Sequence, residues 1–305
     1  MAWEERQTPK GDEVFLDHVG WFVVDLDAAA AQLKRLGFVV SAENVHMNRA
    51  PDGSTAPSGT VNRLATPDLG YLEFLGSRGD APLARQHRAQ LARYEGLHLL
   101  AFSSADVPAE APRLEAEGFR PLPPVDMRRD VQTEGGVEEG RFSVLRVPPE
   151  AMPEGRVQWC AHHTPDLVWQ PGRTPHPNGV QALTGALWVV PDLDEAAARY
   201  ARFLRKPAQP VAPGVVALAL ERGDLLLATP AAARRLIPAL EVPTAPFGAA
   251  VALRVGNLDS TAALLRAAGV AHERAGDRLL VPPAEALGAW LLLHEDSEGL
   301  AASAG

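Results

Sequence analysis

The same order of apolar and polar positions occurs at four places along the chain. At each place an apolar stretch predicts a β-strand, and an amphipathic stretch after a short turn predicts a helix. The first is LDHVGWFVVDLDAAAAQLKRLGF at 16–38. Its variants are LHLLAFSSADVPAEAPRLEAEGF at 97–119, LTGALWVVPDLDEAAARYARFL at 183–204 and AAVALRVGNLDSTAALLRAAG at 249–269. Repetition of one strand–helix unit predicts a protein built from four related modules.

Strict alternation in the first strand predicts which side chains share a face. It places His18 and Gly20 on one face, and Asp17, Val19 and Trp21 on the other. The second face suits packing against a helix, so the face with His18 is free to line a cavity.

The turn and the helix that follow carry recognisable end signals. Asp25 and Asp27 suit the N-cap of a helix, and Gly37 suits the left-handed position after its end. Further strands are expected at 38–41, 60–65 and 71–75, with a loop at 50–59. The order of the first module is therefore βαβββ.

The other modules are predicted to follow the same order. In the second, strands are expected at 97–103, 119–121, 141–147 and 156–163, with a polar loop at 123–140. The segment 164–179 is rich in Pro and Gly, which predicts a linker or a flap over a cavity. The predicted fold is α+β, with four tandem βαβββ modules in two pairs. Residues 1–179 would form the N-terminal domain and 180–305 the C-terminal one.

Charge and composition narrow the function. Lys and Arg number 29 and Asp and Glu 38, which gives a formal net charge of −9. Such a chain does not attract nucleic acid over its whole surface. It has one cysteine, no apolar signal-peptide core and no apolar run of membrane-spanning length. We expect a cytoplasmic protein without a nucleic-acid or membrane partner, which binds a small molecule.

The motifs LDHV…DLDAAA…LGF, GTVNRL, YLEFL, HHTPDLVW and HPNG resemble the vicinal oxygen chelate superfamily, and most closely its glyoxalase-like domain branch. That superfamily includes glyoxalase I, extradiol dioxygenases and bleomycin-resistance proteins. The resemblance implies paired modules that form cup-shaped sheets around a divalent metal ion.

The resemblance also implies the metal ligands. They are His18 and His98 on the first strands of the two modules, Glu73 in YLEFL, and His162 in RVQWCAHHT, with Gln158 as the alternative. Two imidazoles and a carboxylate from different strands can form a facial triad for Fe, Mn, Ni or Zn, and do not choose among them. Without a metal, Glu73 could lie on a solvated face and His162 could cap a strand end.

Other residues are candidates for substrate binding or catalysis. Asn62 could hold a substrate oxygen, Arg63 or Arg129 a carboxylate or phosphate, and Trp159 an aromatic group, although each also has a plain structural interpretation. Glu73 could act as a general base. The first hypothesis is therefore a metal-dependent lyase, isomerase or dioxygenase that acts on a small oxygenated anion.

The second hypothesis is a metal-free protein that sequesters a small molecule, as bleomycin-resistance proteins do. The last two modules have Gly185 and Ala250 at the position of His18, so this pair is expected to be degenerate and to support the first. Modules of this fold can also pair between chains, so a homodimer is compatible with the sequence.

Overall fold

The computed structural model describes residues 7–49, 54–170 and 174–296. The first module contains β1 (Phe15–Phe22), α1 (Leu26–Arg35), β2 (Asn44–Arg49), β3 (Thr55–Ala65) and β4 (Tyr71–Ser77). Helix α2 (Pro82–Leu91) links it to the second, which contains β5 (Gly96–Ser103), α3 (Val107–Ala116), β6 (Val125–Thr133), β7 (Gly136–Arg146) and β8 (Arg156–His162). The short helix η2 (Pro165–Leu167) leads to the second half.

The second half repeats this order. The third module contains β9 (Val180–Val189), α4 (Leu193–Leu204), β10 (Gln209–Ala212), β11 (Val215–Ala219) and β12 (Asp224–Ala228). After α5 (Pro230–Leu236), the fourth contains β13 (Phe247–Val255), α6 (Leu258–Ala267), β14 (Glu273–Ala275), β15 (Arg278–Val281) and β16 (Trp290–His294). The predicted α+β fold of four βαβββ modules is confirmed. None of the helices described is long and apolar enough to cross a membrane.

The helix signals of the first module act as predicted. The Asp25 carboxylate accepts hydrogen bonds from the backbone N–H groups of Asp27 and Ala28, and so caps α1. Gly37 follows the helix with φ of +81°, a conformation that glycine adopts without a steric cost.

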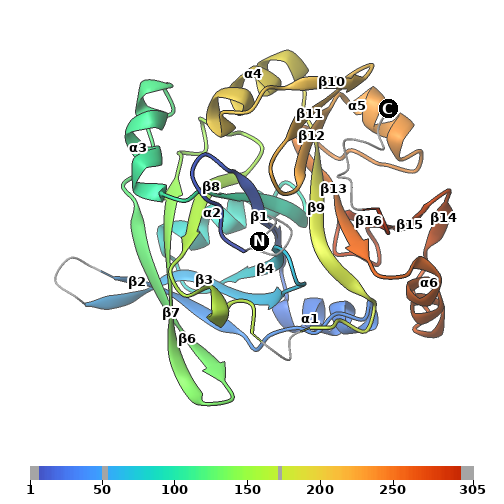
Figure 1. The fold of residues 1–305 in the computed structure, drawn as a ribbon, viewed down its shortest axis with the longest axis horizontal. Helices are drawn as coiled ribbons and strands as arrows, with labels where there is room; N and C mark the ends of the chain where they lie inside the picture. The colour runs from blue at the N-terminus through green and yellow to red at the C-terminus, as the bar shows by residue number, and fades with distance from the viewer. Residues whose placement is uncertain (1–6, 50–53, 171–173, 297–305) are drawn as a thin grey trace.

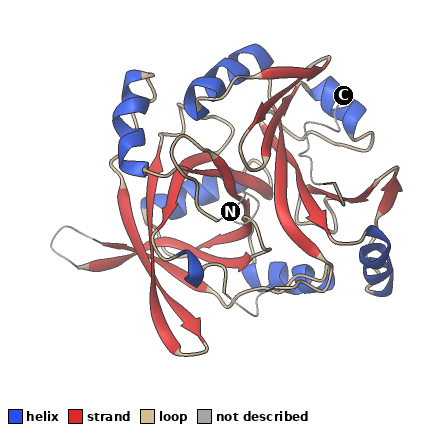
Figure 2. Ribbon diagram, viewed as in Figure 1, coloured by secondary structure: helices blue, strands red, loops and turns tan. Residues whose placement is uncertain are grey.

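Strands of the first two modules close into a ring. The order is β1-β4-β3-β2-β6-β7-β8-β5, and β5 pairs back with β1. The seam between β2 and β6 has only two residue pairs, Met47↔Arg128 and Asn48↔Met127. Figure 1 shows this half from blue to green, beside the second half from yellow to red. The helices lie around the strands (Figure 2).

The two pairs of modules differ in what fills their interior. The first pair encloses a cavity lined mostly by polar and charged side chains. The second is filled by an apolar cluster that includes Leu187, Leu226, Ala250 and Leu292. A larger cluster of buried residues runs across both halves, and β5 touches β13 at the pair Leu97↔Gly248. The division into domains at residue 179 stays a prediction.

Some predicted elements are wrong. No strand forms at 38–41, because β2 begins at Asn44. The expected loop at 123–140 is mostly the β6–β7 hairpin, in which Met127, Arg129 and Val131 face inward at every second position. The arginine and the polar outer residues hid this alternation. Of the loop expected at 50–59, residues 50–53 lie outside the described residues, and β3 starts at Thr55.

Trp159 belongs to the core between the two halves. Its ring stacks on Phe203 at 5.5 Å between centroids and lies 6.2 Å from Phe102, and its side chain is fully buried. We expect Trp159→Ala to lower the free energy of unfolding by about 3–5 kcal/mol, because it leaves a cavity in packed surroundings. Urea denaturation measures the loss.

The matched control is Val137→Ala, since Val137 is 58% exposed on the β6–β7 hairpin. It should change the unfolding free energy by less than about 0.5 kcal/mol. Equal effects of the two substitutions would contradict the packing described for Trp159.

Candidate functional site

A bulge in β1 turns two consecutive side chains toward the inside of the ring of strands. In the ladder with β5, Leu16 pairs with Phe102 and His18 with Ala101, so Asp17 has no opposite residue. Leu16 and Val19 both pack in the larger apolar cluster, on the side of β1 that faces away from the cavity. Asp17 and His18 therefore lie between two outward residues and both face inward, which the expected strict alternation does not allow.

The Asp17 carboxylate holds two imidazoles. Its oxygen Oδ2 lies 2.6 Å from Nδ1 of His18 and 3.0 Å from Nε2 of His162, and the side chain is fully buried. Burial alone would raise the pKa of Asp17. The charges and hydrogen bonds of His162 and His18 outweigh it and hold this pKa well below its usual range.

The second nitrogen of His18 faces the cavity. In the tautomer whose Nδ1–H donates to Asp17, the lone pair of the ring is on Nε2. Nε2 lies 3.6 Å from Oε2 of Glu73 and 3.4 Å from the hydroxyl of Tyr71. The Tyr71 ring stacks on the imidazole at 4.2 Å. His18 is thus fixed in position, with a basic atom directed at the cavity.

Glu73 lies between neighbours that favour its ionised form. The amide of Asn62 donates to Oε1 at 2.6 Å, and Nε2 of His46 lies 3.7 Å from the same oxygen. Burial raises the pKa of Glu73, but the charge of protonated His18 and the hydrogen bond from Asn62 outweigh burial and lower it. Burial lowers the pKa of His46 to about 4, so this imidazole is neutral near pH 7.

Three arginines give the cavity its positive charge. Arg129, Arg146 and Arg156 line it, and among the described residues no carboxylate lies within ion-pair distance of them. Arg156 donates to Oε1 of Gln86 at 3.0 and 3.2 Å. Burial, with Arg146 close by, lowers the pKa of Arg156 to about 9. Against the carboxylates of Asp17 and Glu73, three guanidiniums leave a surplus positive charge for an anionic ligand.

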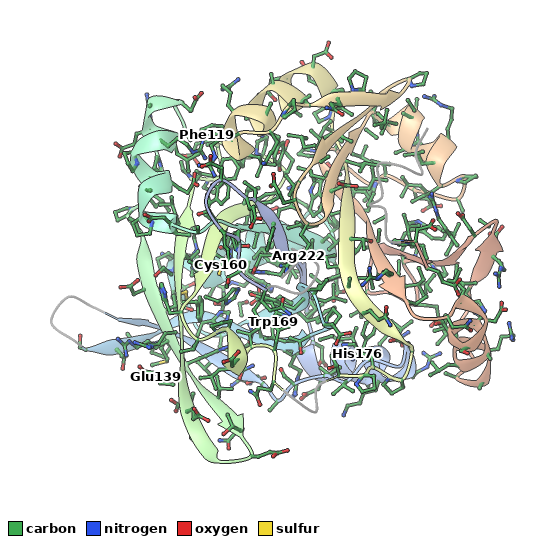
Figure 3. All side chains as sticks on the ribbon, viewed as in Figure 1. Phe119, Glu139, Cys160, Trp169, His176 and Arg222 are labelled. Atoms are coloured by element: carbon green, nitrogen blue, oxygen red, sulfur yellow. The ribbon has the colours of Figure 1, made fainter. Side chains whose placement is uncertain are left out.

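The cavity itself is small. Its volume is about 40 Å³, enough for a few water molecules. The segment 164–170 covers part of it, because the ring of Trp169 contacts those of Tyr71 and His162 at 5.9 and 5.1 Å. Figure 3 labels Trp169 and Cys160 in this half of the molecule, with Glu139 on the outlying β7. The interpretation of 164–179 as a linker or a flap stays a prediction.

The structure does not bring His98 together with His18. Counted back from the helix N-caps Asp25 and Asp106, the residue that matches His18 (25 − 18 = 7) is Leu99 (106 − 99 = 7). His98 matches Asp17 instead and is the bulged residue of β5. Its Nε2 lies 2.8 Å from the carbonyl of Tyr94, and it does not line the cavity. The expected pairing of the two histidines is out of register by one residue.

The last strands follow the same register. Glu73 pairs with Gly20, two residues after His18, and Gln158 pairs with Ala101, two residues after Leu99. Gln158 thus holds the place of Glu73 in the second module, and lines the cavity. His162 lies further along β8, next to Asp17.

The substrate-binding candidates divide into two groups. Asn62 and Arg129 line the cavity. Arg63 points away from it, since its guanidinium lies 2.6 Å from the carboxylate of Asp27 on α1. Trp159 is in the core between the halves. Neither Arg63 nor Trp159 can touch a ligand in this cavity.

Sequence reasoning missed several cavity residues. Asp17 was assigned to the wrong face, because no local signal marks the bulge. His46 comes from β2, which was placed too early. Arg146 and Arg156 lie near the ends of strands, where arginine commonly faces solvent. The number of residues between His98 and the helix N-cap Asp106 was the one signal in the sequence that could have shown that His98 does not match His18.

The divalent metal implied by the resemblance meets an incomplete ligand set at the centre of the cup. His18 and Glu73 are present, but the matching positions of the second module hold Leu99, which cannot bind a metal, and a neutral Gln158. Three guanidiniums also line the same space. The expected set of His18, Glu73, His98 and His162 does not assemble. Among the described residues, the group whose ligand atoms all lie within 4.8 Å of one another is Asp17, Cys160 and His162.

Comparison with known families identifies the class. The model of the glyoxalase-like domain family matches residues 16–204. The chain belongs to this family. No curated protein matches the sequence.

Solved structures share the fold at low sequence identity. A hypothetical protein from Staphylococcus aureus matches with a TM-score of 0.64 and 10% identity, over 92% of this chain and 99% of that one. A variant of 4-hydroxymandelate synthase from Streptomyces coelicolor matches with a TM-score of 0.56 and 14% identity, over 95% of each chain. A xylose isomerase-like TIM barrel/4-hydroxyphenylpyruvate dioxygenase fusion protein gives 0.56 and 14%, over 95% of this chain and 50% of that one. These likenesses support the fold alone.

Buried histidines predict a pH dependence of stability. Burial lowers the pKa of His46, His87, His98 and His176 to about 4, whereas an unfolded histidine has a pKa of about 6.5. Between these values the unfolded chain binds more protons, so acid favours unfolding. The free energy of unfolding should fall by up to about 1.4 kcal/mol per pH unit for each histidine as the pH drops from about 6.5 to 4.

Urea denaturation at several values between about pH 7 and pH 5 tests this. The contribution is fully present above the unfolded pKa and is lost below it. Stability that stays constant or rises on acidification would contradict the burial of the neutral imidazoles.

Proposed function

We propose that the cavity of the first two modules is an active site for proton transfer on a small oxygenated anion, in a reaction of the isomerase, epimerase or lyase type. The observation that carries this proposal is the Asp17–His18 pair. It directs a basic nitrogen into a buried cavity whose arginines have no carboxylate partner among the described residues.

The arginines favour an anionic ligand. A guanidinium offers planar pairs of N–H donors that match a carboxylate or a phosphate. Arg129 and Arg146 lose hydration in the wall of the cavity without an ion-pair partner there, and a bound anion would repay that cost. A cationic ligand would meet a surplus of positive charge.

His18 is suited to act as the general base. Its Nδ1–H donates to Asp17, which fixes the tautomer and stabilises the imidazolium that forms when Nε2 takes a proton. The carboxylate of Glu73, 3.6 Å from Nε2, favours the same protonated state and can accept the proton in turn. Tyr71 stays protonated, because burial and the charge of Asp17 raise its pKa well above its usual value, so its hydroxyl is available as a donor.

The competing function is sequestration of a small molecule without chemistry. Of the two tryptophans that could hold an aromatic ligand for it, Trp159 lies outside the cavity, whereas the ring of Trp169 contacts those of Tyr71 and His162. The two functions differ in one measurable property, because a sequestering protein binds the anion but does not exchange its protons.

Proton transfer can be tested with 2-oxo acids as probes. Pyruvate and 2-oxobutyrate carry exchangeable protons next to a carbonyl, and ¹H NMR in D₂O follows their replacement by deuterium. We expect the protein to accelerate the exchange for at least one member of such a panel, and His18→Ala to reduce the acceleration by about 100-fold or more, since general-base catalysis contributes at least this much.

His98→Ala is the matched control, because it removes a buried histidine from the corresponding strand without touching the cavity. It should leave the exchange rate within about twofold of the wild type. Binding of the probe without any exchange would favour sequestration, and an equal loss in both variants would contradict the role given to His18.

Anion binding has its own test. We expect Arg129→Met to weaken binding of the tightest-bound probe, among phosphate and the two 2-oxo acids, by about tenfold or more, because a charge-assisted hydrogen bond in a buried site contributes roughly 1.5–3 kcal/mol. Isothermal titration calorimetry measures the affinity.

Arg128→Met is the control for the loss of charge. Arg128 is the preceding residue on β6, and its side chain pairs with Glu139 on the outer surface. It should leave the affinity almost unchanged. If both substitutions weaken binding equally, the anion interacts with the general field of the protein and not with the cavity.

A further inference from the structure

Three potential metal ligands from two strands converge on one point of the cavity wall. Cys160 and His162 are alternate residues of β8, so they share a face, and Asp17 is the bulged residue of β1. Sγ of Cys160 lies 3.8 Å from Nε2 of His162, and that nitrogen lies 3.0 Å from Oδ2 of Asp17. All three ligand atoms lie within 4.8 Å of one another.

These distances are close to those of a tetrahedral zinc site. With Zn–S near 2.3 Å and Zn–N and Zn–O near 2.0–2.2 Å, tetrahedral angles place S and N about 3.6 Å apart, and N and O about 3.4 Å apart. The observed 3.8 and 3.0 Å depart from these values by a few tenths of an ångström. Small side-chain rotations would suffice to admit an ion.

The hydrogen bonds of His162 leave its ring incompletely satisfied. Nε2 approaches both a carboxylate and a sulfur atom, but a single hydrogen on it can serve only one of them. Nδ1 is buried and has no hydrogen-bond partner among the described residues. An ion at Nε2 would engage the carboxylate, the sulfur and the imidazole together, and Nδ1 would then carry the proton of the neutral ring.

We propose that Asp17, Cys160 and His162 form a binding site for a divalent metal ion of borderline softness, with zinc as the best match. Oxygen, sulfur and nitrogen ligands suit Zn²⁺ and its spectroscopic substitute Co²⁺, whereas Ca²⁺ and Mg²⁺ prefer oxygen alone. Cys160 and His162 both line the cavity, so an ion could reach them from there.

Electrostatics favour this place over the centre of the cup. Here a carboxylate and a thiolate neutralise the two charges of the ion. Because Asp17 is ionised already, the net charge of the cavity rises by only one unit, through the loss of the Cys160 proton. An ion held by His18 and Glu73 would have only one negative ligand and would add to the charge of the three arginines that line the cavity.

The site also connects to the Asp17–His18 pair. Asp17 bonds Nδ1 of His18 at 2.6 Å, so one carboxylate would ligate the ion and orient the base. Metal binding itself does not rest on the proposed proton transfer, and it can be measured without any substrate.

Cobalt titration of the metal-free protein tests the site. A thiolate bound to Co²⁺ gives an intense charge-transfer band in the near ultraviolet, which nitrogen and oxygen ligands alone do not give. We expect the wild type to bind one equivalent of Co²⁺ with this band and with the visible absorption of a tetrahedral ion, and Zn²⁺ to displace it.

Two variants define the ligands. Cys160→Ser should abolish the charge-transfer band, and His162→Gln should weaken Co²⁺ binding by at least about tenfold, since even the loss of a group that only supports a ligand costs 10- to 100-fold. Circular dichroism checks that both remain folded. If one of them does not fold, the other still decides, because each removes a different ligand.

Glu73→Gln is the control that distinguishes an ion at the proposed site from an ion held by His18 and Glu73 at the centre of the cup. It should leave the band and the affinity almost unchanged. Binding without the band, or binding lost in Glu73→Gln but kept in Cys160→Ser, would place the ion at the centre of the cup and overturn the proposal. Absence of Co²⁺ and Zn²⁺ binding would overturn it as well, and would leave the deuterium-exchange test of proton transfer unaffected.

Discussion

The cavity of the first two modules depends on one buried carboxylate. Asp17 bonds imidazoles from two strands, His18 on β1 and His162 on β8. It can do so only because a bulge turns it inward beside His18. An unpaired buried charge would be costly, so the two imidazoles stabilise the carboxylate as much as it orients them. The position of the base, the charge balance and the candidate metal ligands all follow from this contact.

The closed ring explains why only the first half keeps a polar interior. Its seam, the short β2–β6 ladder, brings His46 and Arg129 to the cavity from neighbouring strands. Among the described strands the second half has no such closure, since its strand path ends at β10 on one side and at β14 on the other. Its interior is apolar, and Thr184 bonds His294 there at 2.7 Å as a satisfied polar pair. The expected degeneracy of this half rests on Gly185 and Ala250, which the register places where His18 lies in the first module.

The sequence predicted the repeat, the helices and the fold class because these depend on local periodicity and on capping residues such as Asp25. It predicted part of the cavity, including His18, Asn62, Glu73 and Arg129. It failed where a shift of one residue decides which face of a strand a side chain occupies. A bulge has no local signature, so Asp17 was assigned outward. His98 was matched to His18 because two histidines near strand starts suggest equivalence, while only the spacing to Asp106 reveals Leu99. Arg63 and Trp159 were misplaced because strand alternation gives two faces without saying which is inside.

The bulge in β1 has counterparts in every module. The ladders skip Asp17, His98, Thr184 and Ala249, and each lies eight residues before the N-cap of the helix that follows, at Asp25, Asp106, Asp192 or Asn257. One irregularity at the same place in four different sequences is a property of the module's backbone. It occurs with side chains as different as a carboxylate and a methyl group. The bulge therefore does not depend on the side chain that it carries, and in the first module it places a carboxylate between His18 and His162.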